Sequence, residues 1–241
     1  MNASTPIHPV TNPMPVVVLL SGRGSNFLAL LDAQRQSRLP IRIVAVLSNR
    51  PDAQGLHAAR EAGLPIRVLP HKKFPGRVAF DAALMEAIDE FHPELVILAG
   101  FMRILTPGFV ARYAGRMLNI HPSLLPDLPG LDTHQRALDA GLKEHGASVH
   151  FVTAEVDGGP VVAQARVPVQ TGDTAQDLAA RVLRQEHRLF PMVVTWFAQG
   201  RLRWTPTGPT LDGAPLAAPL TLDRDVAPEW DERRYTQMKG H

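Results

Sequence analysis

Three strongly apolar runs, each about as long as a β-strand, constrain the fold of this chain more than any other feature of its sequence. They cover residues 16–20, 41–47 and 95–99 and consist mainly of valine, isoleucine and leucine. Such near-continuous apolar strands are typical of parallel sheets that helices cover on both faces. Helix-length segments that end at turn-forming residues lie between them. The alternation predicts an α/β fold with a Rossmann-like, doubly wound, mostly parallel twisted sheet.

The second half of the chain carries a different pattern. Residues 147–152 and 161–169 are strand-like and flank a tight turn at residues 153–160, so they predict a hairpin that extends the sheet. Residues 174–200 predict a long helix, which Pro191 is expected to kink or split. The sheet should therefore be followed by a C-terminal hairpin and a long helix.

The two ends of the chain are weakly patterned. Residues 1–13 are polar and contain proline, and we expect them to form a flexible tail. Residues 205–241 are rich in proline and polar side chains, and their periodicity predicts no regular element in this C-terminal extension. Because no repeat or linker separates two cores, we expect residues 14–204 to fold as a single domain.

The composition excludes several classes of function. Of the 241 residues, 45% are apolar and 20% are charged, which is ordinary for a globular protein. The net charge is only +2 and no block of lysine or arginine occurs, so we expect no nucleic-acid partner. Without cysteine, the chain has no disulfide framework and no thiol nucleophile. Residues 1–13 lack the apolar core of a signal peptide, and no apolar run is long enough to span a membrane. We expect a soluble, cytoplasmic protein that binds no membrane.

A glycine-rich loop at residues 21–26 follows the first strand and precedes a helix. This arrangement presents backbone N–H groups and a helix N-terminus to a phosphate group. Its two glycines match the first half of a dinucleotide fingerprint, but Asn26 and Phe27 stand where the third glycine should fall. The loop therefore favours a monophosphate over a dinucleotide. The alternative is a tight turn in which Ser25 or Asn26 caps the helix.

A second polar segment follows the apolar pair Met117 and Leu118. Asn119 and His121 are two residues apart, so in an extended chain their side chains project into one space. Pro122 favours this conformation, because a residue before proline is disfavoured in the helical region. An amide N–H beside an imidazole can stabilise an oxyanion while protons move at neutral pH. The alternative is a turn with a capping asparagine and a surface histidine.

Five motifs in one order carry a resemblance to a known family. They are Ser-Gly-x-Gly-Ser-Asn at residues 21–26, Leu-Ala-Gly-Phe-Met-Arg-Ile-Leu at 98–105, Asn-Ile-His-Pro-Ser-Leu-Leu-Pro at 119–126, Gly-x-Ser-Val-His-Phe-Val at 146–152 and Val-Asp-Gly-Gly-Pro at 156–160. In these motifs the sequence resembles the glycinamide ribonucleotide formyltransferases, a branch of the folate-dependent formyltransferase family. The resemblance covers about residues 15–204.

The resemblance implies the formyltransferase fold and a reaction in de novo purine biosynthesis. The formyl group of 10-formyltetrahydrofolate, the cosubstrate, would pass to the amine of 5-phosphoribosyl-glycinamide (GAR) and give formyl-GAR. Residues 14–100 would form the phosphate- and nucleotide-binding half, and residues 101–204 the catalytic and folate-binding half. Like the family, the chain would need no metal. A monomer or a homodimer would both be compatible with this resemblance.

The resemblance also implies roles for individual residues. Asn119 would donate its N–H to the oxyanion, His121 would act as general acid and proton shuttle, and Asp157 would favour the charged imidazole. The substrate and its phosphate would be held by Gly24, Ser25, Asn26 and Glu186. The folate pocket would be lined by Arg77, Met102, Arg103, Ile104, Leu105 and Asn119, and by Thr153, Ala154, Glu155, Val156 and Asp157.

Three further positions qualify this assignment. His150 is a candidate for a residue that packs behind the catalytic side chains. The simpler interpretation is a packed core histidine. Asp132 stands where many members of the family have histidine, so we leave it out of the catalytic set. Leu183 stands where some relatives have a polar residue that contacts substrate, so the sequence departs from the family on the long helix.

Other functions remain as alternatives. A methionyl-tRNA formyltransferase would need an additional basic C-terminal domain, which the partly acidic residues 205–241 do not resemble. A formyltetrahydrofolate hydrolase would carry an N-terminal regulatory domain, which residues 1–13 cannot supply. It would also have no need of the glycine-rich loop at residues 21–26, which we call the phosphate loop. A non-catalytic nucleotide-binding module would leave Asn119, His121 and Asp157 without a task. A dehydrogenase is disfavoured by the missing third glycine.

Overall fold

The computed structural model describes residues 12–222. Nearly all of the expected tail at residues 1–13, and the last part of the C-terminal extension, lie outside the described residues.

The first half contains β1 (Met14–Leu20), α1 (Ser25–Arg35), β2 (Ile41–Ser48), α2 (Gly55–Glu61), β3 (Ile66–Val68), the 3-10 helix η1 (His71–Lys73), α3 (Arg77–Asp89) and β4 (Leu95–Leu98). The second half contains α4 (Pro107–Arg112), β5 (Met117–His121), α5 (Thr133–Asp139), β6 (Glu144–Phe151), β7 (Val161–Pro168), α6 (Ala175–Ala198), β8 (Leu202–Thr205), β9 (Gly208–Leu211), β10 (Ala214–Pro215) and β11 (Leu220–Thr221).

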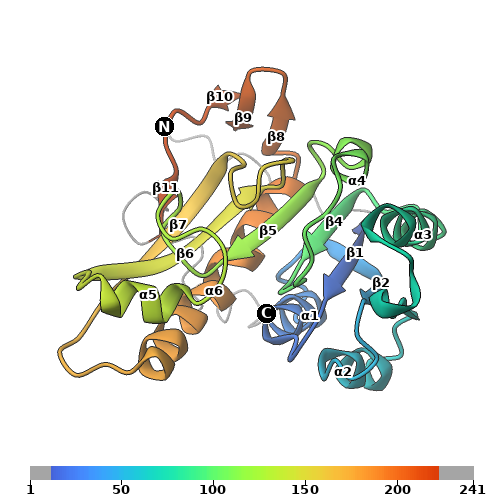
Figure 1. The fold of residues 1–241 in the computed structure, drawn as a ribbon. Helices are drawn as coiled ribbons and strands as arrows, with labels where there is room; N and C mark the ends of the chain where they lie inside the picture. Colours follow the sequence, from blue (N-terminus) through green and yellow to red (C-terminus); the bar gives the residue numbers. More distant parts are fainter. Residues whose placement is uncertain (1–11, 223–241) are drawn as a thin grey trace, which may run out of the picture.

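Eight strands form one mostly parallel sheet in the order β11-β7-β6-β5-β4-β1-β2-β3. The five neighbouring strands β3, β2, β1, β4 and β5 are parallel to one another. The strand β6 is antiparallel to both β5 and β7. The predicted α/β class and the predicted hairpin are therefore confirmed (Figure 1). Because β1, β2, β4 and β5 run in one direction, the loops that follow them meet at one edge of the sheet.

The apolar runs are buried on both faces of the sheet, as their composition predicts. Val16, Val18 and Leu20 of β1 belong to one core cluster, and Val17 and Leu19 belong to another. The first cluster includes side chains of α1, α2, α5 and α6, and the second includes side chains of α3 and α4. Two helical layers thus cover the sheet, and every residue of β1 from Val16 onward is sealed from water.

The long helix α6 crosses one face of the sheet behind β5, β6 and β7 (Figure 1). It begins with a capping box in which the Thr174 side chain accepts from the Asp177 backbone and the Asp177 side chain accepts from Thr174. The helix is continuous through Pro191, so the predicted split is wrong. Tertiary packing explains the continuity, because Pro191, Met192, Val193 and Val194 are all buried and this turn of the helix is therefore packed on every side.

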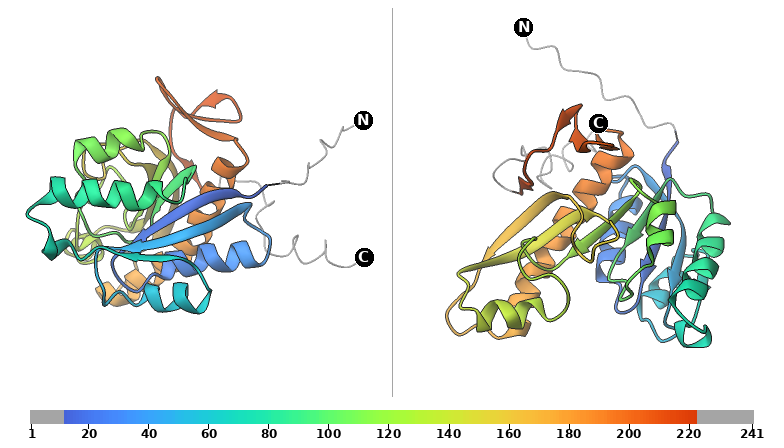
Figure 2. Two further views of the ribbon diagram at one scale, coloured as in Figure 1. Left: turned by 90° about the vertical axis from the view of Figure 1, so that its right-hand side faces the viewer. Right: turned by 45° about the horizontal axis from the view of Figure 1, so that its top comes forward.

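Five elements were not indicated by the sequence pattern. The 3-10 helix η1 lies between β3 and α3, the short helix α4 lies between β4 and β5, and the strands β9, β10 and β11 lie within the C-terminal extension. The strands β8, β9 and β10 form a separate three-stranded antiparallel sheet, which stands at the end of the molecule opposite to α5 (Figures 1 and 2). The chain then returns to the main sheet, where β11 pairs in parallel with β7. Within residues 12–222, no helix combines the length and apolar character needed to cross a lipid bilayer.

Trp204 of β8 packs the three-stranded sheet against the eight-stranded sheet. Its ring packs edge-on against Phe151 at 5.1 Å between centroids. Gly115, which has a φ of 72°, lies so close to this ring that an added Cβ would be 2.8 Å from Trp204 Cβ. Gly115 is therefore required both for its backbone conformation and for the close approach of Trp204.

We expect Gly115→Ala to lower the free energy of unfolding by about 2–4 kcal/mol, because strain at positive φ adds to overpacking. Gly141→Ala is the matched control, since Gly141 has a φ of 63° but no atom within 4 Å of an added Cβ. It should lose only about 1–2 kcal/mol. Urea denaturation of both variants measures the difference. Equal losses would show that the close approach of Trp204 adds no cost to a side chain at position 115.

Candidate active site

Strand β5 places Asn119 and His121 on the same side of the chain near its carboxyl end. In the antiparallel pairing with β6, Asn119 lies opposite His150 and His121 lies opposite Ser148. His121 is only 5% exposed, so it is not the surface histidine of the alternative interpretation. The two polar side chains stand over the sheet at the end where the loops of β1 and β4 also meet.

Asp157 reaches this pair from the loop between β6 and β7. Its Oδ2 lies 3.4 Å from Nδ1 of His121, and its Oδ1 lies 3.9 Å from Nε2 of His150. The backbone of Asp157 is left-handed, with a φ of 53°, a conformation that aspartate adopts more readily than most residues. The N–H of Gly130 donates to Oδ2 of Asp157 at 2.9 Å and helps to hold the carboxylate in place.

The ring of His121 has an acceptor at each nitrogen. Nε2 lies 3.0 Å from the carbonyl oxygen of Leu128, which can only accept a hydrogen bond, so this nitrogen carries a proton. Nδ1 faces the carboxylate of Asp157. An imidazole in this position can hold a second proton at Nδ1 and release it again, which is the property that a proton shuttle requires.

His150 orients the amide of Asn119. Nδ1 of His150 lies 2.9 Å from the carbonyl oxygen of Phe151 and must donate to it. Its Nε2 is then an acceptor in the neutral ring and receives a hydrogen bond from Nδ2 of Asn119 at 3.0 Å. Burial, partly opposed by the bond to Phe151, lowers the pKa of His150 and keeps the ring neutral. The second N–H of the Asn119 amide is left to donate to another group.

His150 is thus a buried histidine with a partner at each ring nitrogen, as the simpler interpretation of the sequence predicts, and one of these partners is Asn119. The strand pattern predicts that His150 belongs to the hairpin, but the pattern does not show which residue of β5 lies opposite. The register of β5 with β6 supplies that information.

The glycine-rich loop leads directly into α1. Gly24 occupies the N-cap position, and no side chain caps the helix, so the capping alternative for Ser25 and Asn26 is wrong. Asn26 instead donates from Nδ2 to Oε2 of Glu186 on α6 at 2.6 Å, across 160 residues of sequence. An added Cβ at Gly24 would lie 2.8 Å from the Cα of Gly55, so the loop packs closely on the start of α2.

Asn26 and Glu186 form a buried polar pair with unused hydrogen-bonding capacity. Among residues 12–222, Oδ1 of Asn26 is buried without a hydrogen-bond partner. Burial raises the pKa of Glu186, and the hydrogen bond from Asn26 partly opposes that shift. Buried polar atoms without partners are uncommon in proteins, and here the free acceptor stands in the first turn of a helix at the loop.

The segment after β4 presents a mixed surface beside β5. Met102 and Ile104 are 65% and 55% exposed, whereas Leu105 packs into the core with α3 and α4. The guanidinium of Arg103 stacks on the ring of Phe80 at 4.8 Å. The structure therefore separates this expected set into two exposed apolar side chains, a stacked cation and a buried anchor.

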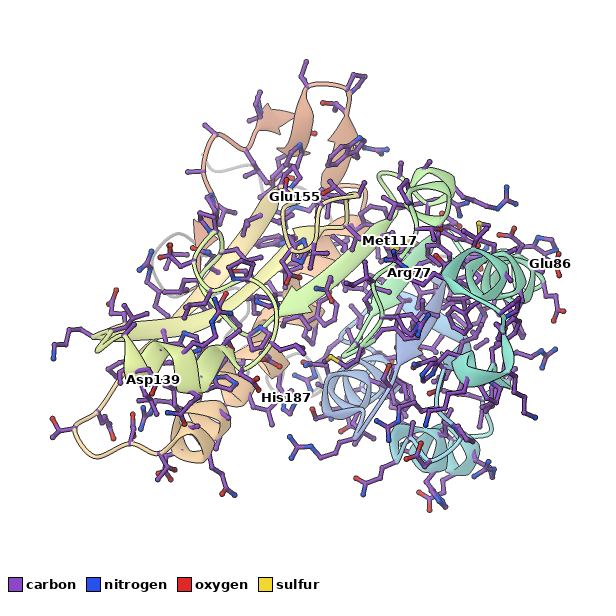
Figure 3. The ribbon with its side chains drawn as sticks, viewed as in Figure 1. Arg77, Glu86, Met117, Asp139, Glu155 and His187 are labelled. Carbon is purple, nitrogen blue, oxygen red and sulfur yellow. The ribbon has the colours of Figure 1, made fainter. Side chains whose placement is uncertain are left out.

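The remaining expected residues lie on two other segments. Arg77 is the first residue of α3, and Glu155 lies in the loop between β6 and β7, as the labels of Figure 3 show. Ala154, Glu155 and Val156 are exposed, and Thr153 is half-buried. Asp132 occupies the N-cap position of α5 with a φ of 56°, and its side chain makes no capping hydrogen bond. Leu183 is half-buried on α6.

Fold and site together define a class of protein. A family model described as formyl transferase matches residues 14–194, and the chain belongs to this family.

Individual relatives are similar over most of this chain. The phosphoribosylglycinamide formyltransferase of Escherichia coli K12 is 53% identical over 203 residues, which cover 84% of this chain and 96% of the relative. The human trifunctional purine biosynthetic protein adenosine-3 is 45% identical over 188 residues, which cover 78% of this chain and 19% of that protein. The structure of a phosphoribosylglycinamide formyltransferase from Coxiella burnetii, at 48% identity, superposes with a TM-score of 0.84 and covers 88% of this chain and all of its own.

The raised pKa of Glu186 predicts a pH-dependent stability difference. A carboxyl whose folded-state pKa exceeds its ordinary value of 4.5 contributes stability below that value and loses it as the pH rises through the folded pKa. Glutamine at this position stays neutral and can still accept from Asn26. We therefore expect Glu186→Gln to gain stability relative to the parent protein as the pH rises above 4.5.

Thermal unfolding of both proteins across this pH range measures the effect. The same substitution at Glu86, an exposed residue of α3, is the control. A stability difference for Glu186→Gln that stays constant with pH would contradict the burial of a carboxyl with a raised pKa.

Proposed function

We propose that this chain transfers the formyl group of 10-formyltetrahydrofolate to the amine of GAR and so makes formyl-GAR in purine biosynthesis. The observation that carries the proposal is the contact of Asp157 with His121, on the strand that also carries Asn119, in a chain that belongs to the formyl transferase family. The names of the Escherichia coli and Coxiella burnetii relatives support the choice of substrate. The chain would act in the cytoplasm, as a monomer or a homodimer.

The chemistry requires an oxyanion donor and a proton carrier. When the amine nitrogen attacks the formyl carbon, a carbon–nitrogen bond forms and the electron pair of the carbonyl moves onto its oxygen. The free N–H of Asn119 stabilises this oxyanion, because His150 already fixes the orientation of the amide. The bond from carbon to the folate nitrogen then breaks as the carbonyl re-forms.

Protons must move between the two nitrogens during this exchange. The attacking amine becomes positively charged and loses a proton, and the departing folate nitrogen gains one. His121 can carry this proton, because one ring nitrogen is anchored on Leu128 and the other faces Asp157. Asp157 stabilises the imidazolium while it exists and holds the ring in a constant orientation.

The two substrates would occupy neighbouring parts of the same surface. Gly24 and Ser25 would bind the phosphate of GAR through backbone N–H groups at the start of α1. Asn26 and Glu186 would contact the rest of the substrate, and the unpartnered Oδ1 of Asn26 is suited to a hydroxyl or amine donor.

The formyl donor would lie on the side of β4. Arg77, Met102, Arg103 and Ile104 would contact the folate, Leu105 would support this wall from the core, and the pterin ring would bind the backbone of residues 153–157. Residues 14–100 would thus serve mainly GAR, and residues 101–204 would supply the catalytic and folate-binding groups.

We expect His121→Ala and Asp157→Ala to lower kcat/KM by a factor that corresponds to about 2–4 kcal/mol or more, because both side chains act mainly in the transition state. Binding of the folate should be largely retained. Steady-state kinetics and folate titration measure the two effects separately. Asp139→Asn, at an exposed aspartate of α5, is the control. Near-normal turnover in either alanine variant would remove that residue from its proposed role.

The hydrolase alternative predicts a different requirement for the amine. The absorbance of the folate product should increase in the presence of this protein only when GAR and 10-formyltetrahydrofolate are both present. Turnover without GAR would favour a formyltetrahydrofolate hydrolase. A lack of turnover under both conditions would favour a non-catalytic nucleotide-binding module.

A further inference from the structure

A buried polar network outside the catalytic segment connects the loops that follow β1, β2, β3 and β4. Its centre consists of Ser21 and Asn49, which directly follow β1 and β2 and are 4% and 3% exposed. Neither residue has a role in the chemistry described above. Buried hydroxyl and amide groups cost free energy unless they are paired, so their partners show what this network holds in place.

The hydroxyl of Ser21 bridges two loops. Its Oγ accepts from the backbone N–H of Met102 at 2.8 Å and lies 2.5 Å from Oδ1 of Asn49. Since a hydroxyl has a single hydrogen, acceptance from Met102 leaves that hydrogen for Asn49. The backbone N–H of Ser21 also donates to the carbonyl of Gly100 at 3.0 Å. Ser21 therefore holds the first residues after β4 by two separate hydrogen bonds.

Asn49 extends the network to the loop after β3. Because its Oδ1 accepts from Ser21, its Nδ2 points the other way and lies 3.2 Å from Nδ1 of His71. The backbone N–H of His71 donates to the carbonyl of Asn49 at 3.3 Å. Nδ1 of His71 also lies 3.1 Å from the carbonyl oxygen of Asn49, which can only accept. The orientation of the Asn49 amide therefore follows from its bond with Ser21, and the backbone carbonyl of Asn49 joins it to His71.

Met102 is the residue of the loop after β4 that this network holds through a side-chain hydrogen bond. The Met102 side chain is mainly exposed and contributes little packing. The backbone N–H of Met102 is held by its hydrogen bond to Ser21. The phosphate loop has anchors of its own, since the carbonyl of Gly22 accepts from Gly55 at 3.0 Å and Asn26 bonds to Glu186. Loss of the Ser21 hydroxyl should therefore disturb Met102 and its neighbours first.

We propose that Ser21 is a positioning residue for the formyl donor, which it serves by fixing the backbone of Met102 with the support of Asn49. The inference rests on the proposed function, because Met102 and Arg103 are assigned there to the folate wall. Ser21 touches no reacting atom, and its effect passes through the wall that the donor contacts.

Ser21→Ala tests this role by removing the hydroxyl and leaving Met102 N–H and Asn49 Oδ1 without their partner. We expect the KM for 10-formyltetrahydrofolate to rise about tenfold, while kcat and the KM for GAR change less than about threefold. Ser21→Thr restores the hydroxyl and should lower the donor KM toward that of the parent protein. A merely structural role would move both KM values together.

Two further variants keep the test decisive. Thr195→Val removes a hydroxyl that is equally buried, at 4% exposed, and that donates to the carbonyl of Pro191 within α6, so it should change neither KM. If Ser21→Ala does not fold, Asn49→Ala removes the other half of the pair and should show the same selective rise in donor KM. An unchanged donor KM in the folded variant, or equal rises for both substrates, would overturn the proposal.

Arg103→Ala separates this inference from the proposed function. A higher donor KM in Arg103→Ala together with an unchanged donor KM in Ser21→Ala would overturn only the positioning role. Unchanged donor KM values in both variants would overturn the assignment of the folate wall as well.

Discussion

The antiparallel register of β6 on β5 is the constraint on which the rest of the site depends. It sets His150 opposite Asn119, so the neutral imidazole fixes the direction of the amide. The strand ends at Phe151, one residue later, and the loop that follows therefore starts beside β5. Only a few residues are then needed to carry Asp157 back to His121. A shift of the register by one residue would turn His150 to the other face of the sheet and dismantle the cluster.

Much of this architecture follows from local rules. Apolar runs bounded by turn formers predicted β1, β2 and β4, and the helices between them follow from helical periodicity. The spacing of Asn119 and His121 predicted that they share one side of a strand. Asp157 was assigned through family resemblance, since nothing in a glycine-rich turn indicates how far its side chain reaches. Its contact with His121 depends on tertiary structure.

The features that sequence reasoning missed are those in which local preference is weak. Helix α4 has six residues and starts at a proline, and β10 and β11 have two residues each, so no periodicity can develop. Pro191 should interrupt a helix in isolation, but packing of α6 against the sheet outweighs the missing backbone hydrogen bond. The contact of Ser21 with Met102 joins residues 81 positions apart and cannot be read from either segment.

The short strands at both rims of the main sheet have a consequence for association between chains. β3 contributes three residues at one rim, and at the other rim the two residues of β11 pair with Ala163 and Gln164 of β7, so the outermost strand on each side is short. Without β11, the whole length of the eight-residue β7 would be open to pairing with a strand of another chain. The returning C-terminal segment thus shortens the stretch of β7 with which a strand of another chain could pair, and long open edge strands favour such pairing.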